Sequence, residues 1–548
     1  MSILSSVALT AVPAEAAYSR IGNPARAYVQ ARAAAMSGDH RRSAELLGLL
    51  AEAESDNQSL MRKAVTAAIG AGDMPLALRL LRRNPSAPLT LDAKLLLIAE
   101  DLRERRTERA VQLIQSPAAD EASVAFLIPL LTAWNAADRN DLNTALTTLE
   151  QVPANSLLGA FRDENRAFIL LKFRRAADAE PFARRAIGSA GGREARLRLA
   201  LADAFLAAGD RQRAAAMVAG MGTEAGTARQ RLLAGKSSGQ AVDSASKAFA
   251  ELLLGIAVDL NRMNTRSLPV GLVQVARYAD PKNSAAAVLL ALLLDGQGRT
   301  QEALAAVGSV RADDPLAAQA RDTAARILTD NGRNQDALRL AWSATSKRGA
   351  GVSDFARLGD VFSAMDRYAE AADAYGRAIT LARSQGLTTE QWPLLLLRAT
   401  ALESANRWPE AQQSLKEALA IAPEQPLILN FLGYAKLERG EDLDAAEAMI
   451  RKASALAPDD ASITDSLGWA LYKRGRLGEA IETLQRAAIK DPQQPEIHEH
   501  LGDALYANGR RYEARFAWTA ALISAEADIA TRIRLKLDNG LTSATAAP

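Results

Sequence analysis

Residues 467–492 read LGWALYKRGRLGEAIETLQRAAIKDP, and the same arrangement of small residues occurs in two stretches before it. These are LGDVFSAMDRYAEAADAYGRAITLA at 358–382 and LGYAKLERGEDLDAAEAMIRKASALAP at 432–458. Each stretch places a Gly in a first predicted helix, an Ala early in a second helix, and another Ala seven residues later. A recurring pattern of this kind predicts a repeated helix–turn–helix unit.

The early Ala of the second helix marks the repeat along most of the chain. In the second half these residues are Ala303, Ala337, Ala371, Ala411, Ala446, Ala480 and Ala514, spaced 34, 34, 40, 35, 34 and 34 residues apart. A weaker series upstream is Ala44, Ala77, Ala110, Ala145, Ala179 and Ala214, spaced 33, 33, 35, 34 and 35 apart. With this period the chain resembles tetratricopeptide repeat (TPR) proteins, which implies an all-α, right-handed superhelical solenoid of about 13–14 repeats.

Each small residue of the pattern has a physical role. Gly359, Gly433, Gly468 and Gly502 are expected where the first helix of a repeat presses against the second, with the alanines meeting them. Gly475 lies in a predicted turn, where a positive φ ends the first helix. Pro492 follows the second helix and stops it, because proline cannot donate to the helical ladder.

The spacing also predicts the domain organisation. From Ala214 the next anchor is Pro269, and the extra residues are rich in Gly and Ser. The predicted parts are a signal-peptide-like segment 1–17, a degenerate TPR array 18–219, a linker or loop 220–242, a second TPR array 243–523, and a capping helix and tail 524–548. In the capping helix Ile529, Ile533 and Leu537 form an apolar stripe, and Lys536 is expected on the solvated side. Arg532 and Arg534 are expected there too, and Gly540 closes the helix.

The balance of charge excludes several functions. The chain has 66 basic and 64 acidic residues, a formal net charge of +2. This predicts neither nucleic acid nor a membrane surface as the main partner. There is no cysteine, so disulfides, thiolate nucleophiles and a cysteine-linked lipid anchor are not expected. The cluster Arg103-Glu104-Arg105-Arg106 is interpreted as a solvated helix face.

No motif points to catalysis, a metal or a cofactor. Ala234-Gly235-Lys236-Ser237 is similar to the end of a phosphate-binding loop, but Gln230 stands where its first Gly would be. His498 and His500 are two residues apart on a predicted helix and point roughly 160° apart, so they are not expected to share a metal ion. The sequence therefore predicts a non-enzyme without cofactor, metal or small-molecule substrate.

The first residues predict the location. MSILSSVALTAVPAEA is apolar and ends in Ala14-Glu15-Ala16, a pattern that signal peptidases accept. We expect export to the periplasm, the alternatives being a frayed tail and a cytoplasmic protein. No later segment has eighteen uninterrupted apolar residues, so no membrane span is expected.

The TPR resemblance implies a concave surface, lined by the first helix of each repeat, that binds proteins or peptides. Matched to the family's groove positions, the expected partner-binding residues are Asn430, Tyr434, Glu438, Asp465, Trp469, Tyr472, Lys473, Asp503 and Tyr506, with Leu437 and Glu499 beside them. The alternative for Trp469 and Tyr472 is that they fill space between helices. The clamp by which some TPR domains grip chaperone carboxyl termini is not reproduced, so that ligand class is disfavoured.

Residues 391–523 resemble one branch of bacterial cell-envelope TPR proteins. The strings that carry the resemblance are NFLGYAKLERGEDLDAAEAMIRKASALAPDD, TDSLGWALYKRG and HEHLGDALYANGRRYEARFAWTAAL. Some of these proteins are lipoprotein adaptors that deliver substrates to a carboxyl-terminal processing protease. The resemblance implies a non-catalytic scaffold or adaptor, with an envelope protease and its substrates as partners. The alternative is a cytoplasmic TPR scaffold of a regulatory or assembly complex.

Overall fold

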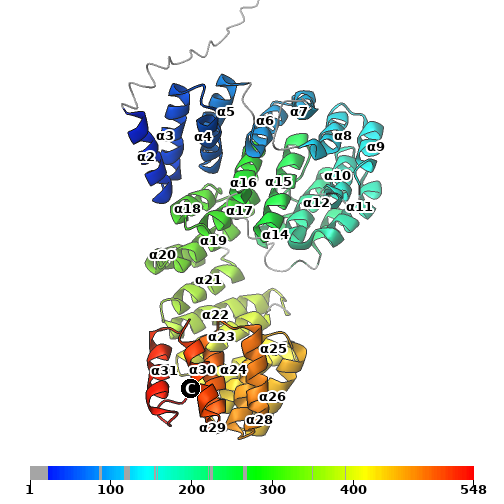
Figure 1. Cartoon of the computed structure of the whole chain (residues 1–548). Helices are drawn as coiled ribbons and strands as arrows, with labels where there is room; N and C mark the ends of the chain where they lie inside the picture. The colour runs from blue at the N-terminus through cyan, green and yellow to red at the C-terminus, as the bar shows by residue number, and fades with distance from the viewer. Residues whose placement is uncertain are drawn as a thin grey trace, which may run out of the picture. The chain divides into compact units, whose positions relative to one another are not determined.

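The computed structural model describes residues 23–85, 89–115, 124–153, 156, 158–219, 221, 226–262, 268–347, 350–388 and 391–547. Every regular element in these residues is helical, and consecutive helix pairs account for nearly all of them (Figure 1). Contacts divide the chain into two compact units, Met1–Ala344 and Thr345–Pro548, and each is described by itself. The predicted all-α solenoid of helix pairs is confirmed. The signal-peptide-like segment 1–17 lies outside the described residues.

The helices of the amino-terminal unit are α2 (Pro24–Met36), α3 (His40–Ala53), α4 (Gln58–Gly70), α5 (Met74–Arg83), α6 (Leu91–Arg103), α7 (Thr107–Gln115), η1 (Ala125–Leu127), α8 (Ile128–Asp138), α9 (Leu142–Glu150), α10 (Gly159–Lys172), α11 (Ala176–Ser189), η2 (Gly191–Arg193), α12 (Glu194–Ala207), α13 (Arg211–Val218), α14 (Gly226–Leu233), α15 (Ala245–Arg262), α16 (Leu268–Ala279), α17 (Ser284–Asp295), α18 (Thr300–Gly308), α19 (Ala317–Asp330) and α20 (Asn334–Thr345).

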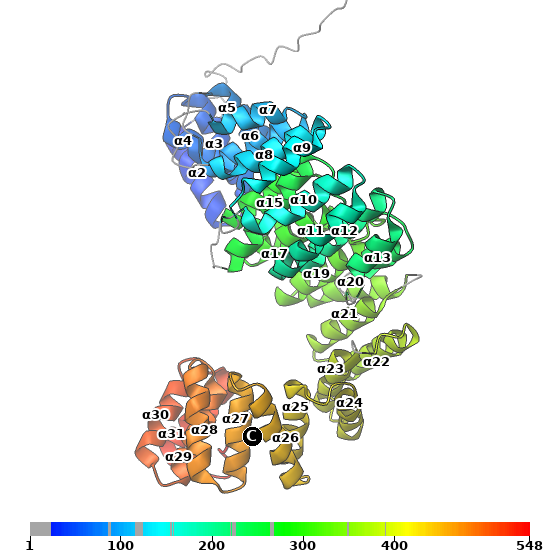
Figure 2. The ribbon, with the colours of Figure 1, turned by 90° about the vertical axis from the view of Figure 1, so that its right-hand side faces the viewer.

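The helices of the carboxyl-terminal unit are α21 (Val352–Ser363), α22 (Tyr368–Ser384), α23 (Gln391–Ser404), α24 (Trp408–Ile421), α25 (Pro426–Glu438), α26 (Leu443–Leu456), α27 (Ala461–Lys473), α28 (Leu477–Lys490), α29 (Pro495–Ala507), α30 (Arg511–Ala521) and α31 (Ala527–Asn539). Figure 2 shows α27 and α28 standing alongside one another in this unit. None of the described helices, in either unit, is both long enough and apolar enough to cross a membrane.

The repeat register is confirmed by the buried alanines. All thirteen predicted anchors, from Ala44 to Ala514, lie in second helices and are at most 1 % exposed. A Cβ added to Gly468 would lie 2.5 Å from Leu484, and one added to Gly502 would lie 2.3 Å from Trp518. The residue that meets each of these glycines most closely is therefore the one four positions after the alanine, rather than the alanine itself.

Local rules explain the turns. Gly72 and Gly209 have φ values of 77° and 94°, which only glycine adopts without strain. The following Asp73 and Asp210 cap the next helix, each accepting a hydrogen bond from a backbone N–H at 3.0 and 2.9 Å. Turn and cap together reverse the chain within a few residues, so each helix packs against the one before it.

In the amino-terminal unit the chain returns to its own first helices. Helices α15 and α16 pack against α4, α6 and α8, the first helices of three successive pairs. The packing is close: a Cβ on Gly255 of α15 would lie 2.6 Å from the ring of Phe161. Arg299 also donates a hydrogen bond to the carbonyl of Gly70 at 3.0 Å, across 229 residues of sequence. One apolar core consequently runs from Ala27 to Ile327.

The predicted linker 220–242 is structured where it is described. Residues 220 and 222–225 lie outside the described residues, and α14 occupies part of the rest. Ser238 and Gln240 are buried, and the carboxylate of Asp203 accepts the backbone N–H groups of Ser238 and Ala241 at 3.1 Å each. The boundary between the compact units lies instead between Ala344 and Thr345.

A candidate partner-binding groove in the carboxyl-terminal unit

The first helices of four successive pairs, α23, α25, α27 and α29, share a cavity of about 430 Å³. On α25, Leu427, Asn430, Phe431 and Tyr434 line it; they are three or four residues apart and so lie on one face of the helix. Helices α25, α27 and α29 are positioned by the contacts of Gly433, Gly468 and Gly502 with α26, α28 and α30, which leave no room for a side chain.

The lining of the cavity combines acidic and apolar side chains. Asp465 and Glu496 contribute carboxylates, and neither lysine nor arginine is among the residues that line it. Leu427, also in the lining, is 49 % exposed, unusual for a large apolar residue in an inner helix. Burial, and then the nearby charges of Glu438 and Asp465, raise the pKa of Tyr434. The phenol is therefore neutral, and its hydroxyl can donate or accept a hydrogen bond.

Two buried acceptors in the lining have no donor among the described residues. Asn430 Oδ1 and Glu496 Oε2 are buried without a hydrogen-bond partner. Asn430 Nδ2 donates to the hydroxyl of Ser466 at 3.2 Å, and that hydroxyl donates to the carbonyl of Ser462 at 3.0 Å. A buried acceptor without a donor costs about 1–3 kcal/mol, so an occupant that supplies donors is favoured here.

The structure separates the predicted partner-binding residues into three sets. Asn430, Tyr434 and Asp465 line the cavity. The second set is Glu438 on α25 with Trp469, Tyr472 and Lys473 on α27. The third set is Asp503 and Tyr506 on α29, which lie next to Lys536 and Gly540 of the last helix and its end. Partner binding by these residues stays a prediction, but only the first set lines the cavity.

Trp469 is fully buried and packs between repeats. Its Nε1 donates to Glu438 Oε1 at 2.9 Å, and Lys473 reaches the other carboxylate oxygen at 3.4 Å. Its ring stacks on Tyr472 at 4.6 Å and on His500 at 4.2 Å between centroids. Of the two roles considered for Trp469, the filling of space between helices is the one seen in the structure.

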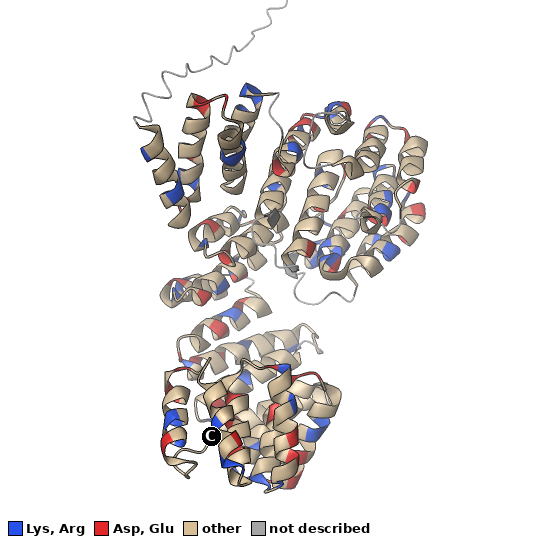
Figure 3. Ribbon diagram, viewed as in Figure 1, with Lys and Arg blue, Asp and Glu red and all other residues tan. Residues whose placement is uncertain are grey.

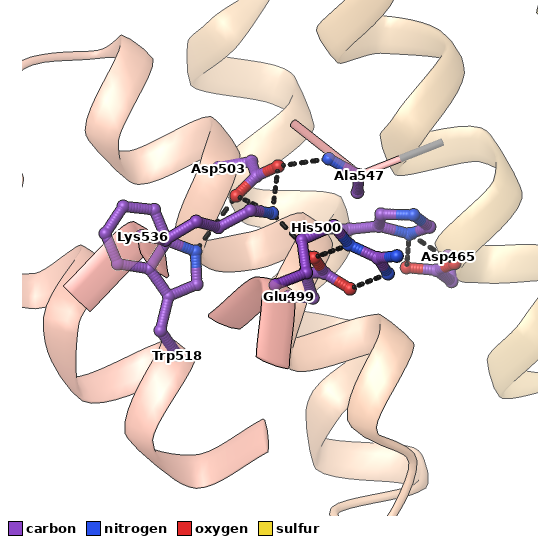
Figure 4. A network of polar contacts seen from close by, with 8 residues as sticks. Asp465, Glu499, His500, Asp503, Trp518, Lys536 and Ala547 are labelled. Carbon is purple, nitrogen blue, oxygen red and sulfur yellow. Dashed lines mark hydrogen bonds and ion pairs between the residues drawn. The ribbon is translucent and has the colours of Figure 1, made fainter. Parts of the chain in front are cut away.

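His500 connects this cluster to the cavity. It is buried, and its Nδ1 lies 2.9–3.0 Å from both carboxylate oxygens of Asp465 (Figure 4). Burial lowers the pKa of His500, but the charge and hydrogen bond of Asp465 outweigh it, so the pKa lies above 6.5. His500 of α29 therefore packs between repeats, against Trp469 of α27. No group of three or more metal-ligating side chains occurs in the described parts of the chain.

The last helix covers Asp503. Lys536 of α31 is fully buried, and its Nζ lies 2.7 Å from Glu499 Oε1 and 2.7 Å from Asp503 Oδ2 (Figure 4). Asp503 also accepts from Trp518 Nε1 and from the backbone N–H of Ala547, both at 2.9 Å. Burial, opposed by Lys536, raises the pKa of Asp503.

The expectation that Lys536 faces solvent is therefore wrong. Ile533 is buried and Gly540 ends the helix with a φ of 79°, as predicted. Lys536, however, is seven residues after Ile529 and shares its face, so it points inward with the apolar stripe. Arg532 also turns inward and grips Glu499 through two hydrogen bonds of 2.7 Å. Burial raises the pKa of Glu499, but these bonds prevail and hold it low.

Sequence reasoning missed Phe431, Glu496 and the exposed Leu427. Phe431 was detectable, because it lies three residues before Tyr434, a predicted groove residue, and so shares its helix face. Glu496 was not, because nothing in one repeat shows that its neighbours leave it without a donor. Acidic and basic residues are interspersed along the helices, which hides such a site in the sequence (Figure 3).

Comparison with known proteins agrees with the helix-pair architecture. Residues 396–461 match a family model described as tetratricopeptide repeat, and residues 468–509 match one described as TPR repeat. Similar solved structures include the APC/C hetero-tetramer Cut9–Hcn1 (15 % identity, 96 % of this chain and 98 % of that chain, TM-score 0.39). A tetratricopeptide repeat protein from Parabacteroides merdae (14 %, 46 % and 97 %, 0.38) and the MamA protein (20 %, 36 % and 98 %, 0.27) are also similar. No curated protein matches the chain.

The described residues thus form an α-solenoid of helix pairs, and the pairs within 396–461 and 468–509 match tetratricopeptide repeats. TPR repeats are protein-interaction modules, so the class of protein is an interaction scaffold.

Proposed function

We propose that the carboxyl-terminal unit binds an extended segment of a partner protein in the cavity formed by α23, α25, α27 and α29. The observation that carries this proposal is the pair of buried acceptors without donors, Asn430 Oδ1 and Glu496 Oε2, on the cavity wall. A peptide supplies such donors at every residue through its backbone N–H groups.

The cavity chemistry narrows the partner segment. Glu496 has no cation within ion-pair distance in the described structure, because its neighbour Arg532 is engaged with Glu499. A lysine or arginine of the partner would therefore gain a charge-assisted hydrogen bond there. Leu427 and Phe431 offer apolar surface to the residues beside it. The segment is expected to carry a basic side chain flanked by apolar ones.

The proposal is tested with Glu496→Gln and Asn430→Ala. A partner captured from the native cell is identified by mass spectrometry, and its binding to the purified variants is titrated. Loss of a hydrogen bond to a charged group removes about 1.5–3 kcal/mol, so Glu496→Gln should weaken binding about tenfold or more. Glu482→Gln, an exposed change on α28, is the matched control. Unchanged affinity in both groove variants, with helix content preserved, would place the site elsewhere.

We further propose that the scaffold works in the bacterial cell envelope, as an adaptor for a processing protease. The support is Ala14-Glu15-Ala16 and the resemblance of residues 391–523 to envelope TPR adaptors. Amino-terminal sequencing of the mature protein should find the first residues removed. An intact Met1 in the cell would favour the alternative, a cytoplasmic scaffold.

The adaptor role assigns the chemistry to the partner. Purified chain alone is expected to leave peptide and cell-wall substrates intact, while adding it to its protease partner should speed degradation of the protein it delivers. Hydrolysis by the chain alone, abolished by a point mutation, would contradict the adaptor role.

A further inference from the structure

The amino-terminal unit contains a second, differently charged cavity. It has a volume of about 1100 Å³ and lies among the ends of α6, α8, α10 and α12, the start of α15 and the loop after α16. Eight lysine and arginine side chains line it against four acidic ones. The cluster around Arg103, interpreted from the sequence as a solvated helix face, forms one side of this cavity.

Half of these basic residues are neutralised by carboxylates. Lys172 pairs with Asp138 and Lys247 with Asp243, both at 2.9 Å. Arg106 pairs with Asp101 at 2.8 Å, and Arg139 pairs with Glu108. Three of the four acidic residues in the lining are therefore already paired with a cation.

The other basic residues have no acidic partner in the described structure. Arg103 lies over the ring of Tyr278, with its guanidinium 4.2 Å from the centroid. Arg105, Arg174 and Lys282 have no carboxylate within ion-pair distance among the described residues and are exposed to the cavity. Asp280 remains as a single acid without a cation, and burial raises its pKa. Four positive charges thus face one space with little to offset them.

Two of these arginines stand at positions that favour glycine. Arg105 and Arg174 each have a φ of 57°, a conformation that residues with a side chain rarely adopt. The equivalent turns of the pairs on either side contain Gly72 and Gly209. The backbone conformation of these turns does not favour arginine, so its presence needs another reason. Both side chains line the same cavity, which points to a role there.

We propose that this cavity binds an acidic peptide segment of a partner protein. Planar guanidinium groups bind carboxylates through two parallel hydrogen bonds. Arg105 and Arg174 belong to turns two repeats apart and line the same cavity. A cavity of about 1100 Å³ bounded by several helix ends has room for several residues of an extended chain, whereas a single phosphate would fill only part of it. The site is in the other unit and does not depend on the groove at Asn430.

Direct titration tests the site with defined probes. Fluorescein-labelled hexaglutamate is expected to bind the full chain, more weakly as salt rises, and hexaglutamine is expected not to bind. The variant Arg105→Gly/Arg174→Gly removes two charges and installs the residue that neighbouring turns use, so folding should be preserved. Hexaglutamate affinity should fall at least tenfold in it.

The matched control is Asn140→Gly. Asn140 has a φ of 65° in the equivalent turn between α8 and α9 but does not line the cavity. It should keep wild-type affinity for hexaglutamate. Equal binding by the double variant and the wild-type chain would overturn the proposal, as would equal binding of hexaglutamine. Pyrophosphate that binds as tightly as hexaglutamate, with the same loss in the double variant, would overturn the peptide assignment in favour of a small anion.

Discussion

In the amino-terminal unit α15 and α16 cover the first helices α4, α6 and α8, whereas in the carboxyl-terminal unit α23, α25, α27 and α29 leave a cavity between them. The repeat is the same in both, with a buried Ala in each second helix. What differs is the occupant of the inner face, and an inner face left open is available to a partner. The two cavities described above also differ in charge: the amino-terminal one is lined mainly by basic residues, and the groove at Asn430 has no lysine or arginine in its lining.

The largest effect is expected from Lys536→Met, which tests how far the stability of the carboxyl-terminal unit depends on its last helix, α31. Lys536 is the buried cation of Asp503, and removing one partner of a buried ion pair costs about 3–5 kcal/mol. Urea unfolding followed by tryptophan fluorescence measures the loss, because Trp518 contacts Asp503. Arg534→Met, an exposed change on the same helix, should stay within about 0.5 kcal/mol. Similar losses in both variants would contradict the structural role of Lys536.

A pH-dependent loss should follow in the same unit. Because Asp465 holds the pKa of His500 above 6.5, the folded state binds that proton more tightly than the unfolded state. The stabilisation is present below pH 6.5 and is lost as the pH rises through the folded pKa. The loss should not exceed about 1.5–3 kcal/mol, the range for a hydrogen bond to a charged group.

Asp465→Asn is expected to flatten this dependence. The other charges near His500, those of Asp503 and Glu499, remain in the variant, so a small slope should persist. Unfolding free energies measured across neutral pH give the slope, and His498→Gln controls for the neighbouring histidine. If the slope is unchanged in Asp465→Asn but absent in His498→Gln, the titrating group is His498, and the role given to His500 is contradicted.

Contacts within one repeat could be predicted from the sequence. Gly468 meets Leu484 only sixteen residues later, so the demand for a small residue recurs with the period and is visible in a single chain. Gly475 has the expected positive φ for the same reason. Spacing alone was sufficient to place these residues and the helix pairs around them.

Contacts between repeats could not be predicted. Trp469 is buried because His500 and Glu438, each 31 residues away, enclose it, and a single repeat does not show which neighbours do so. The packing of the later helices of the amino-terminal unit on its first ones depends on contacts such as that of Arg299, at the start of α18, with Gly70, 229 residues apart. The burial of Lys536 could have been predicted, because Lys536 shares a helix face with Ile529 and Ile533.

Replacing one tightly packed glycine in each unit by leucine should show how far the damage spreads in each. Gly468→Leu forces a side chain into Leu484 within a repeat, and Gly255→Leu forces one into Phe161 where α15 covers the first array. Each should cost about 1–3 kcal/mol or more. Hydrogen exchange should show the first change spreading to adjoining pairs, and the second exposing α15, α16 and the helices beneath them. Glu482→Leu, on an exposed face, should cost less than about 0.5 kcal/mol.

The smallest expected effect is a gain in stability. Arg105→Gly/Arg174→Gly relieves two left-handed residues, each strained by about 1–2 kcal/mol, while each new glycine costs about 0.5–1 kcal/mol in the unfolded chain. The net gain in the amino-terminal unit should be about 1 kcal/mol, measured by differential scanning calorimetry. Asn406→Gly, with a φ of 60° in the other unit, should change little, because asparagine tolerates this conformation. A gain confined to the arginines would mean that they are kept at a cost to stability, as expected of a binding site. A loss would mean that they support the ends of α6 and α10, and the basic cavity would then be part of the fold.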